Sequence, residues 1–160
     1  MRSAMRRSKS SMLLGAAIIL IGPILGGQNA SAFADEAEVD QQIETLLGDM
    51  LDYKELFHAF RSAVAQRDAE TVASLVSYPI TVTQDSVQST YVDASEFVEY
   101  YDDIITPEIR AAVVDQDYGS LSVSGDGIML GNGEVWINGI CADDSCSQVL
   151  PRVVTIQDAQ

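Results

Sequence analysis

The sequence feature that most constrains the fold is the stretch Gly127–Asn138, in which two apolar runs flank the dipeptide Asn132-Gly133. This dipeptide readily takes the two positive φ angles of a type I′ turn, so the stretch predicts a tight β-hairpin. A two-residue turn also sets the register of the strands. The expected cross-strand pairs are Gly131 with Glu134, Leu130 with Val135, Met129 with Trp136, and Ile128 with Ile137.

The predicted register gives the hairpin two different faces, because successive side chains of a strand point to opposite sides. One face is aliphatic and carries Ile128, Leu130, Val135 and Ile137. The other is an apolar floor with two polar groups, formed by Met129, Glu134, Trp136 and Asn138. This second face has the composition of a ligand-pocket wall and equally that of a half-buried outer face.

The first 34 residues have the pattern of a secretory signal peptide. A basic start precedes the apolar run Met12–Leu25, and the small-x-small sequences Ala30-Ser31-Ala32 and Ala32-Phe33-Ala34 follow it. The run is too short to span a membrane comfortably, and polar sequence follows directly. We therefore expect export to the periplasm, or secretion, and a mature chain of residues 35–160 that forms a single domain.

The charge of the chain excludes two classes of partner. The formal net charge is −15, and the predicted mature chain keeps 5 basic and 24 acidic residues, a net charge of −19. Such an acidic body repels nucleic acid and anionic lipid, so we expect neither nucleic acid nor, after signal removal, a membrane as partner. The charge favours a cationic partner or ligand, and the solubility of an exported protein would explain it as well.

Cys141 and Cys146 are the only cysteines, and export makes a disulfide their default state. A metal site using Asp143 and Asp144 between the thiols is the alternative, but CxxC spacing and a nearby histidine are missing. The four-residue spacing is also wrong for a redox motif. We predict a disulfide, no metal site and no cofactor.

Hydrophobic periodicity and capping patterns predict helices on both sides of a strand pair. Apolar residues recur at helical spacing over 39–65, with a break near Gly48–Asp52. N-cap residues predict further helices over 69–76 and 93–105 and from Thr106-Pro107 onward.

Three strands are predicted in addition to the central hairpin pair. Ile80–Gln84 and Val87–Val92 alternate around a turn, and Val149–Ile156 forms a last strand. Pro151 places this last strand at a sheet edge or restricts its pairing at the start. The order of elements predicts an α+β fold, with helices packed on one face of a mostly antiparallel sheet.

This order resembles the nuclear-transport-factor-two-like (SnoaL-like) superfamily, and within it small exported bacterial members with no established function. The segments that carry the resemblance are Phe57–Val64 with Asp68, Leu75–Pro79, Phe97–Ile105 leading into Thr106-Pro107, and Gly131–Ile137. The resemblance implies a cone-shaped, cystatin-like roll, in which a curved sheet wraps around a long helix and encloses a pocket. It also implies that pairing of two copies through the open sheet, as a homodimer, is one arrangement to test.

The candidates for the wall of this pocket are Trp136, Glu134, Met129, Tyr100, Tyr101 and Phe60. Trp136 and Glu134 are preferred, because residues two apart on a strand point the same way and could hold an apolar or cationic ligand. The alternative is that Trp136 fills the core and Glu134 caps the turn.

The resemblance also implies isomerases and dehydratases that use a pocket aspartate or a histidine–aspartate pair. The side chains available for such chemistry are Asp85, Asp102, Tyr78, Tyr100, Tyr101, Glu134 and His58. Nothing in their spacing brings them together, so no catalytic residue is assigned. The sequence therefore favours a non-catalytic binding or interaction module over a small pocket enzyme. An acidic inhibitor of a cationic secreted protein is a third interpretation.

Overall fold

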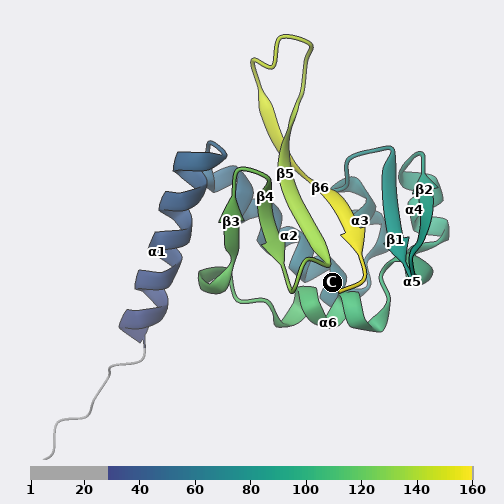
Figure 1. Ribbon diagram of the computed structural model, residues 1–160, viewed down its shortest axis with the longest axis horizontal. Coiled ribbons are helices and arrows are strands. Elements are labelled where there is room, and N and C mark those ends of the chain that lie inside the picture. The colour runs from purple at the N-terminus through teal and green to yellow at the C-terminus, as the bar shows by residue number, and fades with distance from the viewer. Residues whose placement is uncertain (1–28, 160) are drawn as a thin grey trace, which may run out of the picture.

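The computed structural model describes residues 29–159, with side chains from Asp35 onward, and shows an α+β fold (Figure 1). Most of the predicted signal peptide lies outside the described residues. The helices are α1 (Asn29–Leu46), α2 (Met50–Gln66), α3 (Ala69–Ser74), α4 (Ala94–Glu99), α5 (Tyr101–Ile104), α6 (Pro107–Asp115) and the 3₁₀ turn η1 (Tyr118–Ser120). The strands are β1 (Ile80–Gln84), β2 (Val87–Tyr91), β3 (Ser122–Ser124), β4 (Gly127–Leu130), β5 (Val135–Cys141) and β6 (Val149–Gln157).

The helix boundaries follow the predicted capping residues. The break near Gly48 is confirmed: Gly48 has a φ of +118°, and the Asp49 carboxylate accepts the Leu51 N–H at 2.9 Å to begin α2. Side chains at Asp68, Asp93 and Thr106 likewise cap α3, α4 and α6. The single helix predicted over 93–105 is interrupted at Tyr100, which divides it into α4 and α5.

The six strands form one mixed sheet in the order β2-β1-β6-β5-β4-β3. Four of the five neighbouring pairs are antiparallel, and β1 with β6 is parallel. Two sequence-based expectations are corrected here. The short strand β3 is absent from the prediction. Strand β6 is central, so the edge position expected from Pro151 is wrong, whereas the alternative, restricted pairing at the start of the strand, agrees with the structure. Pro151 pairs with Gly139 of β5 and has no partner in β1. Strand β1 pairs only with Ile156 and Gln157, at the other end of β6, and Pro151 is therefore tolerated.

The register of the β4–β5 hairpin is as predicted, with Ile128, Met129 and Leu130 opposite Ile137, Trp136 and Val135. The turn type is wrong. Positive φ angles occur at Gly131 (+66°) and Gly133 (+108°), not at Asn132. The chain instead places positive φ angles at both central residues of the β1–β2 turn, Asp85 (+50°) and Ser86 (+64°), as a type I′ turn requires.

The aliphatic face of the hairpin is the centre of the core. Its four side chains are fully buried, together with Val153 and Ile156 of β6 and Phe57 and Phe60 of α2. Helix α2 packs on this face of the sheet, while the opposite face has no helix layer of its own (Figure 1). The domain is thus two layers around one core, with the second sheet face left open.

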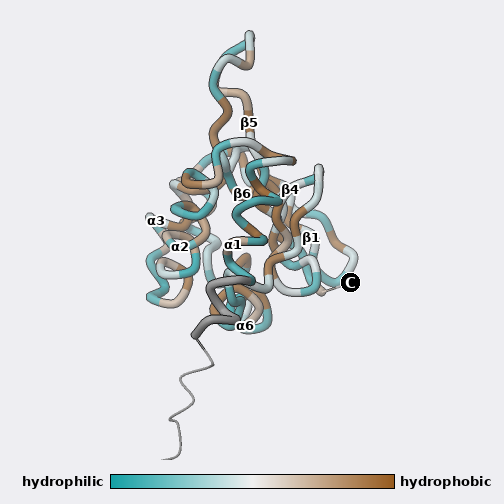
Figure 2. Tube along the Cα trace, turned by 90° about the vertical axis from the view of Figure 1, so that its left-hand side faces the viewer, coloured by the Kyte–Doolittle hydropathy of each residue, from teal (hydrophilic) through white to brown (hydrophobic). Residues whose placement is uncertain are grey.

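The ends of β5 and β6 extend beyond the body as a two-stranded arm, seen in two perpendicular views (Figures 1 and 2). The predicted disulfide between Cys141 and Cys146 closes its exposed tip. Asp143 lies inside this loop and accepts the N–H groups of Ser145 and Ser147 at 2.9 and 3.1 Å. Its carboxylate therefore organises the loop.

Helix α1 is held on the body by its buried residues Val39 and Ile43 and by a polar cluster. Lys54 of α2 lies 3.2 Å from both Glu36 and Asp40 of α1, and its ammonium is 4.4 Å from the centre of the Tyr118 ring. The Tyr118 hydroxyl donates to Asp40 at 2.6 Å. Burial, together with this carboxylate, raises the pKa of Tyr118 above its ordinary value.

Truncation of the core at Phe60 is expected to cost about 3–5 kcal/mol in the free energy of unfolding, because Phe60→Ala leaves a cavity on the fully buried face of α2. Leu51→Ala in the same helix is the control, since Leu51 is 63% exposed. Urea unfolding of the two variants checks this. Equal losses would contradict the assignment of the core.

The free energy of unfolding is expected to fall above about pH 10. Burial raises the pKa of Tyr78 to about 12, and it raises the pKa of Tyr118 as well. Unfolding lets these phenols ionise near their ordinary pKa of 10.0, so the stabilisation is complete below that pH and is lost above it. Tyr118→Phe should reduce the slope of the unfolding free energy against pH by up to about 1.4 kcal/mol per pH unit. Urea titrations at several alkaline pH values measure it, and an unchanged slope would refute the contribution of Tyr118.

Candidate functional site

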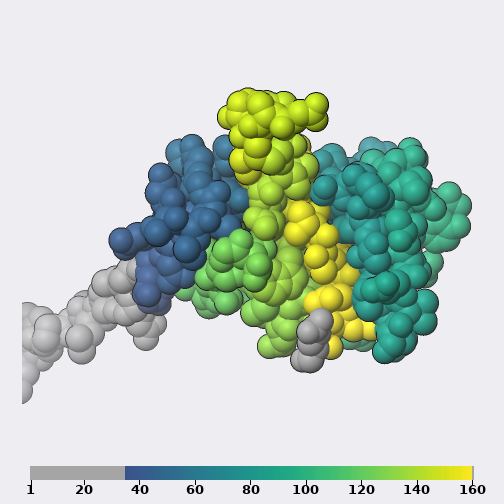
Figure 3. All heavy atoms as spheres, turned by 45° about the horizontal axis from the view of Figure 1, so that its top comes forward, coloured from purple at the N-terminus to yellow at the C-terminus, as the bar shows by residue number. Residues whose placement is uncertain are grey.

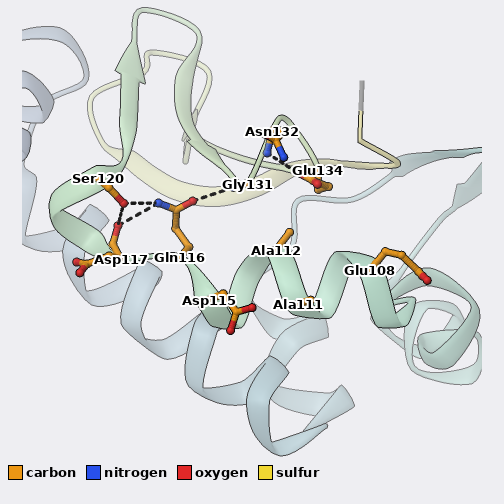
Figure 4. A pocket seen from close by; sticks show the side chains of 10 residues that line it. All are labelled: Glu108, Ala111, Ala112, Asp115, Gln116, Asp117, Ser120, Gly131, Asn132 and Glu134. Carbon is orange, nitrogen blue, oxygen red and sulfur yellow. Dashed lines mark hydrogen bonds between the residues drawn. The ribbon is translucent and has the colours of Figure 1, made fainter.

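A cleft of about 480 Å³ lies between α6 and the β4–β5 turn (Figure 4). Helix α6 runs beneath the turn, with Glu108 and Asp115 on the helix and Asn132 and Glu134 on the turn. The residues that line it are Glu108, Ala111, Ala112, Asp115, Gln116, Asp117, Ser120, Gly131, Asn132 and Glu134. Its four ionisable side chains are all carboxylic acids.

A second cavity of about 450 Å³ adjoins this cleft, and the two share Glu108 and Glu134. It adds Asp85 from the β1–β2 turn and Asp158 from the segment after β6. Among the described residues, no lysine, arginine or histidine lines either cavity. The two cavities therefore form one acidic cleft, defined here by the carboxylates of Asp85, Glu108, Asp115, Asp117, Glu134 and Asp158.

Glu134 is the centre of this acidic cleft. It is 6% exposed, and it is the one charged residue that is buried in the part of the chain that the structure describes. Its carboxylate accepts the Asn132 N–H at 2.5 Å and forms no ion pair with any described residue. A buried carboxylate with a single neutral donor is electrostatically uncompensated, so it favours the approach of a positive group.

The glycine at position 131 creates the space that Glu134 occupies. A Cβ atom at Gly131 would overlap the Glu134 carboxylate and lie 2.9 Å from Cβ of Ala112. The positive φ of Gly131 also suits glycine best. The turn thus folds a carboxylate back toward α6, and its positive φ angles lie at Gly131 and Gly133.

The wall of the cleft is held by Gln116, at the end of α6. Its side-chain carbonyl accepts the Gly131 N–H at 2.9 Å, and its amide donates to Ser120 Oγ at 3.1 Å and to the Asp117 carbonyl at 3.0 Å (Figure 4). These bonds link α6, η1 and the turn, so the carboxylates lie on a cross-linked frame.

The structure separates the two preferred pocket residues. Glu134 belongs to the turn and faces α6, whereas Trp136 lies in β5 opposite Met129, on the open face of the sheet. The expectation that both point the same way is wrong, because the two-residue alternation applies within a strand and Glu134 precedes the strand. The hydrogen bond that Glu134 accepts from the Asn132 N–H agrees with the alternative interpretation, in which Glu134 caps the turn.

The other pocket candidates lie elsewhere. Phe60 and Tyr101 are core residues, and Tyr100 is 42% exposed beside Tyr91. Of the side chains considered for catalysis, Asp102 pairs with Arg67, His58 is exposed and stacked on Tyr118, and the Tyr78 hydroxyl donates to the Ala73 carbonyl. Only Asp85 and Glu134 line the same cavity. The structure therefore brings together two carboxylates of this set, and none of its tyrosines or its histidine lines that cavity.

Sequence reasoning missed Glu108, Asp115, Asp117 and Gln116. One signal was present: Glu108 and Asp115 are seven residues apart, so a helix places them on the same face, with Ala111 and Ala112 between them. The approach of that face to the hairpin turn is a tertiary contact that periodicity does not reveal.

Within residues 29–159, no group of three or more His, Cys, Asp or Glu side chains is arranged to hold a metal ion. No helix in that range is long and apolar enough to cross a membrane.

No protein-family model, characterised protein or solved structure matches the chain in sequence or fold comparisons.

The fit of Glu134 beneath the turn predicts that Gly131→Ala lowers the free energy of unfolding by about 2–3 kcal/mol, through overlap and an unfavourable positive φ. Gly125→Ala is the matched control, because nothing lies within 4 Å of its Cβ position. Its effect should stay within about 0.5 kcal/mol. If thermal and urea unfolding give the two variants the same stability, the packing described here is incorrect.

Proposed function

We propose that this protein is an exported, non-catalytic binding module whose acidic cleft holds an organic cation. One observation carries the proposal: six carboxylates from α6, two turns, the segment before η1 and the segment after β6 line adjoining cavities with no basic side chain among the described residues. An ammonium or guanidinium group would supply the missing positive charge.

The size and spacing of the site favour an organic cation over a metal ion. The cavities of about 480 and 450 Å³ are in the range of small-molecule sites. The carboxylates are spread along the cleft and do not converge as metal ligands do. A ligand with two or more separated amines would reach several of them at once.

We further propose that the chain is a distant relative of the nuclear-transport-factor-two-like superfamily, with its cone-shaped roll, and that a signal peptide directs it to the periplasm. The order of elements and the β4–β5 hairpin support the first proposal. The disulfide fits an oxidising compartment and so supports export.

The other two functions have less support. An isomerase or dehydratase needs a carboxylate and a donor at one site, and the side chains considered for that role are dispersed. Inhibition of a cationic secreted protein uses the same charge complementarity, with a lysine or arginine side chain of the partner in the acidic cleft. Ligand size would separate this role from small-molecule binding.

Calorimetric titration with spermidine tests the proposed function. We expect binding that weakens with added salt, because the attraction is between exposed charges. The double variant Glu108→Gln/Asp115→Asn should weaken binding by about three- to tenfold, since each exposed charge contributes up to about 1 kcal/mol.

The matched control is Glu70→Gln/Glu99→Gln, which removes the same charge from exposed positions on α3 and α4. It should bind spermidine as the unmodified protein does. Equal weakening by both double variants would mean that only the overall charge matters, and no binding by the unmodified protein would refute the proposal.

A further inference from the structure

The carboxylates of this protein are segregated from its sheet. None of the 24 acidic residues lies in any of the six described strands, whose only lysine or arginine is Arg152. Because one face of the sheet is buried in the core, the open face is a largely uncharged surface on a strongly acidic protein. Figure 3 shows this surface over β4, β5 and β6, between α1 and the β1–β2 pair.

The open face carries a continuous row of neutral side chains across four strands. Cross-strand pairing places Ser122 opposite Met129, Met129 opposite Trp136, and Trp136 opposite Thr155. A second row, of Gln88, Thr83 and Gln157, continues over β2, β1 and β6. All of these side chains are partly or fully exposed.

Trp136 lies at the centre of the first row. Its indole N–H donates to no acceptor among the described residues, and it is not sealed from solvent. Next to it, Gly133 has no side chain, and a Cβ there would be 3.8 Å from Trp136 Nε1 and 3.9 Å from Met129 Sδ. An aromatic ring and a free donor thus lie side by side on this face.

From this arrangement we propose that the open face binds a neutral polysaccharide chain. The acidic surroundings repel an anionic ligand, and the strands provide no carboxylate for a cationic one. A pyranose ring offers apolar C–H faces that stack on indole, and hydroxyl groups that pair with the neutral amides and hydroxyls of Asn138, Thr155 and Gln157.

The shape of the face favours an extended ligand over a single sugar. Four neighbouring strands span roughly 14 Å, which is the length of about three pyranose units. A small molecule is held best in a concave site, whereas a chain can gain contacts along a flat row. The role is separate from cation binding in the acidic cleft, and neither depends on the other.

Trp136 is the only tryptophan of the chain, so its fluorescence reports directly on this face. The test is to titrate the full protein with cellohexaose, chitohexaose and maltohexaose, with glucose as the single-sugar control. We expect at least one hexaose, but not glucose, to shift the emission and to protect Trp136 from acrylamide quenching. Added salt should leave this affinity unchanged, because no charges are paired.

Calorimetry of variants then separates stacking from fold. Trp136→Ala should weaken hexaose binding by about tenfold or more, while Trp136→Phe, which keeps an aromatic face, should retain most of it. Glu108→Gln/Asp115→Asn should bind the hexaose normally, because its substitutions lie in the acidic cleft.

Three results would overturn the proposal. One is that none of the hexaoses changes the emission or releases heat. Another is that Trp136→Ala, while folded by circular dichroism, binds as well as the unmodified protein. The third is a dimer in sedimentation equilibrium whose Trp136 is already shielded from acrylamide without glycan, since a second copy would then cover the face.

Discussion

The fold depends on the burial of one face of the sheet against α2. The aliphatic side chains of β4 and β5 are fully buried there, with Phe57 and Phe60 of α2 packed into the same core. This burial fixes the position of the hairpin, and the hairpin turn then meets α6. The acidic cleft exists because the core holds these two elements together, while Gly131 leaves room for the Glu134 carboxylate between them.

Charge segregation is the second organising property. All the acidic residues lie in helices, turns and loops, so the strands carry no carboxylate, and Arg152 is their one lysine or arginine. Like charges concentrated on one cleft repel one another and would be stabilised by a bound cation. The same distribution leaves the open sheet face free for a neutral partner. One acidic sequence thus presents two surfaces with different chemistry.

Local signals in the sequence predicted most of the elements. Caps at Asp68 and Thr106, the break at Gly48 and the pairing of Met129 with Trp136 all depend on neighbours close in the chain, and all are confirmed. The errors concern tertiary context. The edge position expected from Pro151 is wrong, because β1 pairs with the far end of β6, and the restricted pairing at the start of that strand is the alternative that holds.

The site was predicted less well than the fold, for a physical reason. The sequence indicates Glu134 as a site residue, but strand alternation places it on the side of Trp136, and that rule fails here because Glu134 lies in the turn, one residue before β5. Its neighbours across the cleft come from α6, which ends at Asp115, 19 residues earlier in the chain. Glu108 and Asp115 look like ordinary solvated helix residues until the turn is placed over them.

The most direct measurement is native mass spectrometry of the untagged protein, purified at low salt from the cells that produce it, against a denatured control. We expect a small organic cation that is present only in the native spectrum. We also expect loss of that cation in Glu108→Gln/Asp115→Asn but not in Glu70→Gln/Glu99→Gln. A native spectrum with an anionic molecule, or the same cation retained by both double variants, would contradict the assignment of the acidic cleft as the binding site.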